Sequence, residues 1–261
     1  MYKIGLSTCG RIIDEADFFQ YKNAGIDAVE ISVGLDNCDK IDFAKLLKLS
    51  NAYDVRLWSF HLPFSPFSKL EISQKELAGS TIAYFEELIK KAANVGIDKF
   101  VIHPSGEPIA PEDRAERLKV SKESLFKLSS IATRNGSVIA VEDLPRTCLG
   151  NCSDEMLELI SVDPALRVCF DTNHLLGESQ VDFIKRVGNK IVTLHVSDYD
   201  FINERHWLPG KGKIDWKTLV KALNESAYNG VWMYEVALEN YTFDEFYQNG
   251  KSILEGAAEK D

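Results

Sequence analysis

Short apolar runs alternate along the chain with longer segments in which apolar residues recur every three or four positions. The short runs are rich in β-branched and aromatic residues, and several are apolar nearly throughout, as expected of strands buried on both faces. Eight runs are predicted to be strands: residues 3–7, 28–32, 56–61, 99–103, 137–142, 167–171, 191–196 and 230–236. This alternation is typical of βα units and predicts a parallel sheet.

The segments between the strands carry helical spacing and signals for helix starts. Between positions 77 and 92, apolar residues recur at three- and four-residue steps and form one stripe. Ser73 with Glu76, and Thr242 with Glu245, have the spacing of a capping box. We expect helices to begin at both places.

Eight strand–helix repeats are compatible with a closed barrel or an open, doubly wound sheet. An open sheet usually carries a glycine-rich turn after its first strand. Here that turn, residues 7–11, reads Ser-Thr-Cys-Gly-Arg and lacks a G-x-G-x-x-G pattern. No linker-like tract divides the 261 residues, a length close to that of one barrel. The sequence therefore predicts the α/β class, with a single (β/α)8 TIM barrel domain over residues 1–261.

Charge and composition narrow the range of partners. The formal net charge of −10 repels nucleic-acid phosphates and disfavours nonspecific binding to nucleic acid. No apolar run approaches the ~20 residues that span a bilayer, and the first residues lead directly into a strand. We therefore expect a cytoplasmic protein with a small-molecule substrate and no membrane partner. The oligomeric state, a homo-oligomer included, stays open.

In a barrel, catalytic groups lie at the C-terminal ends of the strands. Six consecutive strands, from the third to the eighth, each bring a metal-binding or acid–base side chain to that rim: His61, His103, Glu142, Asp171, His195 and Glu235. Each alone has a simpler interpretation as a structural ion pair or a hydrogen-bonded core histidine. Together they predict a functional site, because buried carboxylates are costly unless paired or coordinated.

The residue types at this rim indicate a metal. Two glutamates, an aspartate and one histidine offer mostly hard oxygen ligands and one imidazole, which suits Mn²⁺ or Mg²⁺, with Co²⁺ or Zn²⁺ also compatible. Asp171 and His174 are three residues apart where the sixth strand ends. This spacing would turn His174 back towards a substrate hydroxyl beside the metal.

The loop after the seventh strand supplies further candidate ligands. We expect His206 to bind a substrate oxygen or a second metal, and Arg205 to bind an acidic or phosphorylated end of the substrate. Gly210 and Gly212 are expected to let the backbone approach a ligand closely. The alternative is a solvated loop whose glycines only serve turns.

Several motifs, weak singly but in a specific order, carry a family resemblance. They read FHLP (60–63), VEDLP (141–145), FDTNH (170–174), LHVSD (194–198), RHWLPGKGKIDW (205–216) and YEV (234–236). With them the chain resembles the xylose-isomerase-like TIM barrel superfamily of sugar phosphate isomerases and epimerases. That superfamily includes ketose 3-epimerases, hydroxypyruvate isomerase, inosose-processing enzymes and endonuclease IV.

The resemblance implies a role for each of the rim residues. Four of them would hold the metal: Glu142, Asp171, His195 and Glu235. In the epimerase branch, the two glutamates also act as acid and base. Four histidines match positions that bind further metals in the endonuclease branch or touch substrate: His61, His103, His174 and His206.

Two positions depart from the family pattern. Glu204 stands where the endonuclease has an aspartate, which puts a third metal in doubt. Cys148 stands where the epimerases have a second substrate glutamate, which argues against a close copy of those enzymes.

The resulting prediction is a metal-dependent isomerase or epimerase of a sugar, sugar phosphate or related polyhydroxy carbonyl compound. It would act by proton transfer through an enediolate. The alternatives are a dehydratase or lyase of the dehydroshikimate or inosose type and, less favoured, an endonuclease IV-like phosphodiesterase.

Overall fold

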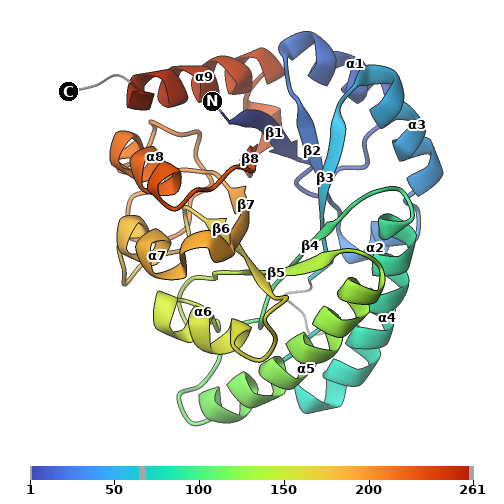
Figure 1. The fold of residues 1–261 in the computed structure, drawn as a ribbon, viewed down its shortest axis with the longest axis vertical. Helices are drawn as coiled ribbons and strands as arrows, with labels where there is room; N and C mark the ends of the chain where they lie inside the picture. Colours follow the sequence, from blue (N-terminus) through green and yellow to red (C-terminus); the bar gives the residue numbers. More distant parts are fainter. Residues whose placement is uncertain (1, 65–68, 259–261) are drawn as a thin grey trace.

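A ring of parallel strands forms the centre of the molecule, with helices around it (Figure 1). The computed structural model describes residues 2–64 and 69–258. Its strands are β1 (Lys3–Ser7), β2 (Ala28–Ser32), β3 (Arg56–His61), β4 (Lys99–Ile102), β5 (Val138–Glu142), β6 (Arg167–Asp171), β7 (Ile191–His195) and β8 (Val231–Tyr234). The predicted (β/α)8 barrel is confirmed. Positions 1, 65–68 and 259–261, which the expected domain also covered, lie outside the described residues.

The strands pair in chain order, and the ring closes between the last two. Parallel pairing runs from β1 through β7, and β1 also pairs with β8. At the remaining junction, the N–H of Val196 donates to the carbonyl of Met233 at 2.8 Å, and the N–H of Glu235 donates to the carbonyl of Val196 at 3.1 Å. The C-terminal ends of β7 and β8 are therefore joined directly.

The helices cover the outer face of the ring. They are α1 (Glu15–Ala24), α2 (Leu35–Cys38), α3 (Phe43–Tyr53), α4 (Lys75–Ala93), α5 (Arg114–Arg134), α6 (Ser153–Ile160), α7 (Gln180–Val187), α8 (Trp216–Glu225) and α9 (Phe243–Ala258). The predicted stripe on α4 buries Phe85, Leu88 and Ile89 in the main hydrophobic core. Among the described residues, no helix combines the length and apolar character needed to cross a membrane.

Helices begin at both expected places, but only one of the two expected capping boxes, that of α9, is confirmed. At α9, the N–H of Thr242 donates to Oε2 of Glu245 at 2.7 Å, and the N–H of Glu245 donates to the Thr242 hydroxyl at 3.3 Å. At α4, however, the cap is Gln74. Ser73 lies outside the helix, where its N–H and hydroxyl donate to Oε1 of Glu71, at 2.9 and 2.8 Å, and its hydroxyl accepts from Nε of Arg117 at 2.7 Å.

Three strands, β4, β7 and β8, are shorter than predicted at the rim. The last register pair of β4 with β5 is Ile102 with Val141, and β8 ends at Tyr234. His103 and Glu235 therefore follow their strands instead of lying on them. Both still lie at the rim, because each comes directly after the last paired residue.

Candidate active site

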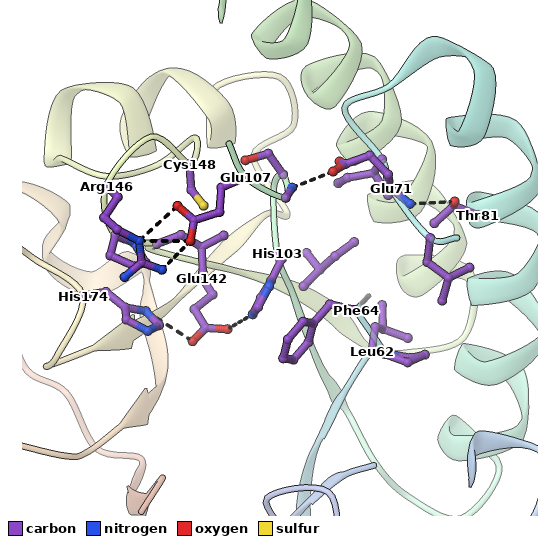
Figure 2. A pocket seen from close by; sticks show the side chains of 18 of the residues that line it. Leu62, Phe64, Glu71, Thr81, His103, Glu107, Glu142, Arg146, Cys148 and His174 are labelled. Atoms are coloured by element: carbon purple, nitrogen blue, oxygen red, sulfur yellow. Dashed lines mark hydrogen bonds and ion pairs between the residues drawn. The ribbon is translucent and has the colours of Figure 1, made fainter. Parts of the chain in front are cut away.

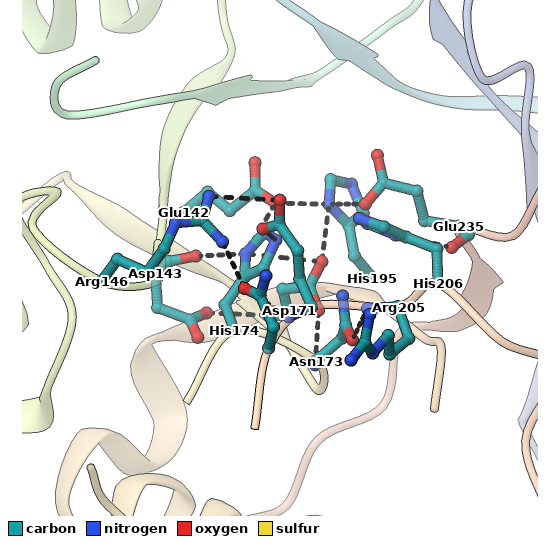
Figure 3. A network of polar contacts seen from close by, with 12 residues as sticks. Glu142, Asp143, Arg146, Asp171, Asn173, His174, His195, Arg205, His206 and Glu235 are labelled. Atoms are coloured by element: carbon teal, nitrogen blue, oxygen red, sulfur yellow. Dashed lines mark hydrogen bonds and ion pairs between the residues drawn. The ribbon is translucent and has the colours of Figure 1, made fainter. Parts of the chain in front are cut away.

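The four side chains expected to bind a metal converge at the C-terminal rim of the barrel (Figure 3). Each of Glu142, Asp171, His195 and Glu235 has a ligand atom within 4.8 Å of those of the others. Nδ1 of His195 is central, since it lies 2.8 Å from Oε1 of Glu142 and 3.3 Å from Oε2 of Glu235. The residues come from the ends of four consecutive strands, β5 to β8, so the barrel fixes their spacing.

The burial of Asp171 without a partner for one of its oxygens among the described residues indicates that the cluster fits a cation. Its side chain is fully buried, and within the described part of the chain its Oδ2 atom has no hydrogen-bond partner. Burial, followed by the charge of Glu235, raises the pKa of Asp171 well above its ordinary value. A buried carboxylate is costly to ionise without a positive partner. A divalent ion would supply that partner, and the three carboxylates and one imidazole are suitable ligands for it.

Glu142 is held by three histidines. Its Oε2 atom lies 3.1 Å from Nε2 of His61 and 3.1 Å from Nε2 of His103, while His195 contacts the other oxygen. Burial opposes ionisation of Glu142, but the charges of His195 and His103 outweigh it and hold the pKa well below its ordinary value. Glu142 is therefore a carboxylate at neutral pH.

The remaining histidines belong to three further groups whose potential ligand atoms lie within 4.8 Å of one another. His61 and His103 share Glu142 in one group, and His61 joins His195 and Glu235 in the second. His174, Glu204 and His206 form the third. Nε2 of His174 lies 3.6 Å from Oε2 of Glu204, so the longer acid at this position still reaches the histidine. All four histidines of the family pattern therefore lie at the same rim.

A cavity of about 320 Å³ opens onto these groups (Figure 2). Its polar wall contains Glu142, His103, His174, His206 and Glu235. Its apolar wall contains Leu62, Phe64, Ile72, Phe85 and Ile102. The ring of Phe64 stacks on that of His103, with centroids 4.2 Å apart. A small molecule in this cavity would contact apolar side chains and the carboxylate cluster at once.

The arginine that lines the cavity is Arg146. The guanidinium of Arg205, the residue chosen from the sequence, instead donates from Nε to Asp200 at 2.9 Å, and Arg205 is not part of the cavity wall. Arg146 donates from Nε to Glu107 at 3.0 Å and pairs with Glu204 at 3.2 Å. The one usable signal for Arg146 in the sequence is its position directly after the VEDLP motif.

Asp198 organises the loop between β7 and α8. Its buried carboxylate accepts hydrogen bonds from the backbone of Tyr199, Gly210 and Ile214 and from the indole of Trp216. A Cβ atom added at Gly212 would lie 2.2 Å from Oδ1 of Asp198. The close backbone approach that Gly212 allows is therefore to Asp198 and to the carbonyl of Tyr199. The same loop carries His206, whose Nδ1 atom lies at 3.2 Å from the carbonyl oxygen of Glu235.

Glu30 contacts the cluster from behind His195 and was not predicted from the sequence. It lies on β2, is fully buried, and places Oε1 2.9 Å from Nε2 of His195. Its other oxygen accepts a hydrogen bond from the Ser59 hydroxyl at 2.8 Å. The available signal was an acidic residue in the middle of an otherwise apolar strand.

Comparison with known proteins places this geometry in context. The family model described as "xylose isomerase-like TIM barrel" matches residues 18–258. An uncharacterized protein of Methanocaldococcus jannaschii is 23% identical over 211 residues, covering 80% of this chain and 81% of the relative. Another uncharacterized protein of that organism is 24% identical, covering 75% of this chain and 68% of the relative.

Solved structures share the fold over nearly the whole chain. A D-tagatose 3-epimerase-like protein matches with a TM-score of 0.85 and 22% identity, covering 98% of both chains. An L-ribulose 3-epimerase matches with a TM-score of 0.79 and 18% identity, over 98% of this chain and 96% of that one. A 3-keto-D-glucoside 4-epimerase from E. coli has a TM-score of 0.78 and 16% identity, over 97% of this chain and 99% of that one.

Proposed function

The chain belongs to the xylose isomerase-like TIM barrel family, and we propose that it is a divalent-metal-dependent isomerase or epimerase. The substrate class is a sugar, a sugar phosphate or a related polyhydroxy carbonyl compound. One observation carries the proposal: two carboxylates, Glu142 and Glu235, flank the same imidazole nitrogen at the wall of a cavity. The epimerases among the similar folds support it.

The metal would be held by the four converging side chains, with Mn²⁺ or Mg²⁺ best suited to their mostly oxygen donors. When bound, it would stabilise the negative charge that develops on adjacent carbonyl and hydroxyl oxygens as the C–H between them loses its proton. The protein itself must then remove that proton and return it.

Glu235 is the better placed of the two glutamates to remove the proton. Its side chain is 18% exposed, against 1% for Glu142, and it lines the cavity. Burial opposes its ionisation, but the charge of His195 outweighs burial and lowers the pKa of Glu235. Glu235 thus begins as a base, while Glu142, on β5, would exchange the proton from another side. His103 and His206, also in the cavity wall, would orient the substrate hydroxyls.

The proton transfer is tested in deuterated water. Purified protein with Mn²⁺ would be incubated with a panel of ketoses, aldoses and their phosphates, and the carbon next to the carbonyl examined for deuterium. Deuterium in the product supports proton transfer, whereas a metal-assisted hydride shift would leave that carbon unlabelled. Glu142→Gln and Glu235→Gln should each lower turnover at least ~10²-fold, the usual scale for a lost acid–base group.

A matched control removes a carboxylate far from the cavity. Glu158→Gln, on α6, loses an exposed pair with Lys122 and should keep full turnover. Near-normal turnover in both active-site variants would end the proposal.

A second candidate is hydrolysis of a phosphoester by clustered metals. It is favoured because Glu142 is shared by three groups of residues that could each hold a metal ion. The net charge of −10 weighs against a DNA substrate, and we expect no binding to abasic duplex at ~0.1 M salt. Metal analysis separates the two candidates. One ion per chain supports the isomerase, while three ions with metal-dependent incision of abasic duplex would support the hydrolase.

A further inference from the structure

The inner face of the barrel holds a carboxylate behind the central histidine. The imidazole of His195 lies between two acids, with Nδ1 2.8 Å from Oε1 of Glu142 and Nε2 2.9 Å from Oε1 of Glu30. Glu142 is on the cavity side, where the other candidate metal ligands gather. Glu30 is on the other side of the imidazole and does not line the cavity.

The burial of Glu30 requires a compensating interaction. The residue is 0% exposed and occupies the centre of a strand whose neighbours, Val29 and Ile31, are buried in the apolar core. Ionising a carboxylate there is costly unless each oxygen is hydrogen-bonded. The Oε1 atom of Glu30 contacts Nε2 of His195, and its Oε2 atom accepts a hydrogen bond from the Ser59 hydroxyl. Ser59 thus fixes one oxygen and directs the other at the imidazole.

We propose that Glu30 is a positioning residue: when a metal ion binds and the ring of His195 is neutral, Glu30 keeps the proton on Nε2 and so leaves the lone pair of Nδ1 for the ion. A neutral imidazole carries one N–H, and the hydrogen bond made by one nitrogen decides which nitrogen remains free. Nδ1 is the nitrogen that faces Glu142 and Glu235. This inference rests on the metal-binding role of the cluster in the proposed function.

The direct test is the affinity for Mn²⁺, measured on the full-length chain by competition with a fluorescent chelator. Glu30→Gln keeps the shape of the side chain but removes its charge, and should raise the Kd for Mn²⁺ by about 10- to 100-fold, the usual effect of mutating the residue behind a metal-binding histidine. Ser59→Ala leaves Glu30 in place without its anchor and should raise the Kd several-fold.

A purely structural role would give a different pattern. If Glu30 only filled space, the variants would change the melting temperature of the chelator-treated protein and leave the Mn²⁺ affinity within twofold of the wild type. That result would overturn the inference while leaving the proposed function standing. A wild-type chain that binds no divalent ion would instead overturn the metal-dependent function, and the inference with it.

A second measurement needs no variant at Glu30. In the Mg²⁺-loaded wild type, long-range ¹H–¹⁵N spectra of the imidazoles, with His195 assigned by its loss in His195→Gln, should show the proton on Nε2. A proton on Nδ1 of His195 would overturn the proposal even if Glu30→Gln failed to fold.

Discussion

Nδ1 of His195 lies 2.8 Å from Oε1 of Glu142, so an imidazole from β7 meets a carboxylate from β5 across the end of β6. The strand between them ends in Asp171, whose Oδ2 atom lies 4.0 Å from the same nitrogen. Three neighbouring strands thus direct donor atoms at one point. Without a cation, this point collects carboxylates whose charges repel one another.

Metal should therefore stabilise the fold measurably. An ion that binds only the native state contributes about 2.7 kcal/mol at a concentration 100 times its Kd. We expect a higher melting temperature with Mn²⁺ than with EDTA, because the ion neutralises the carboxylate cluster. In Asp171→Asn, this difference should largely disappear. Identical wild-type melts with Mn²⁺ and with EDTA would argue against a metal site.

Stability should also depend on pH through Asp143. Oδ1 of Asp143 accepts the N–H of Asp171 at 2.7 Å, but its buried Oδ2 has no hydrogen-bond partner among the described residues. Burial, with a contribution from Asp171, raises the pKa of Asp143 well above its ordinary value. A raised carboxyl pKa favours the native state at low pH, and this stabilisation is lost as the pH rises through the native-state pKa.

Asp143→Asn removes that titration and keeps the oxygen that accepts the hydrogen bond. We expect the variant to be more stable than the wild type by about 1 kcal/mol at pH 8, since it buries no charge. The difference should shrink as the pH falls towards 4, where the wild-type carboxyl is protonated. Urea denaturation of the chelator-treated proteins across this range measures it, and a difference independent of pH would count against the assignment.

His206 should matter for turnover and Arg205 should not. The variant His206→Ala should lose one hydrogen bond to the substrate. We therefore expect its kcat/KM to fall about tenfold, with little change in the melting temperature. Arg205→Gln is the matched control from the same loop, because its guanidinium faces Asp200. Equal losses in both variants would mean that Arg205 turns towards the substrate. Full activity in His206→Ala would mean that the loop has a structural role and does not contact the substrate through His206.

Two glycines should respond in opposite directions to alanine. In Gly212→Ala, the new methyl group would lie 2.2 Å from Oδ1 of Asp198, and overpacking of this kind costs about 1–3 kcal/mol. Gly79 lies on α4 with open space around it, so Gly79→Ala should stabilise the helix by about 0.5–1 kcal/mol. Thermal melts of both variants test this, and a Gly212→Ala protein as stable as wild type would show that both Asp198 and the backbone of Tyr199 can move.

The strands were the most predictable part of the structure. β6 has the predicted bounds, Arg167–Asp171, because a strand buried on both faces reads as an apolar run that ends where the polar loop begins. The prediction for β8 extended to Val236, which is buried although the strand ends at Tyr234. At this end of β8, buried residues continue past the last residue of the strand. A hydrophobic pattern indicates which residues are buried, but not where the strand hydrogen bonds end.

The site was predictable only where topology alone places the residues. Glu142 and Asp171 were found because the ends of parallel strands meet at one rim. Glu30 was missed because its role depends on a contact with His195, 165 positions away, which no local spacing encodes. Arg146 was missed for a similar reason, since its partners Glu107 and Glu204 come from other loops.

The junction between β7 and β8 has a consequence for synthesis on the ribosome. Glu235, whose N–H bonds to Val196, is the last of the clustered ligands to leave the exit tunnel. Until it emerges, the nascent chain has unpaired edges on β1 and β7, and exposed edges invite pairing with other chains. A divalent ion that needs all four ligands would bind tightly only once the ring has closed. Metal capture would then favour the completed barrel over partly synthesised chains.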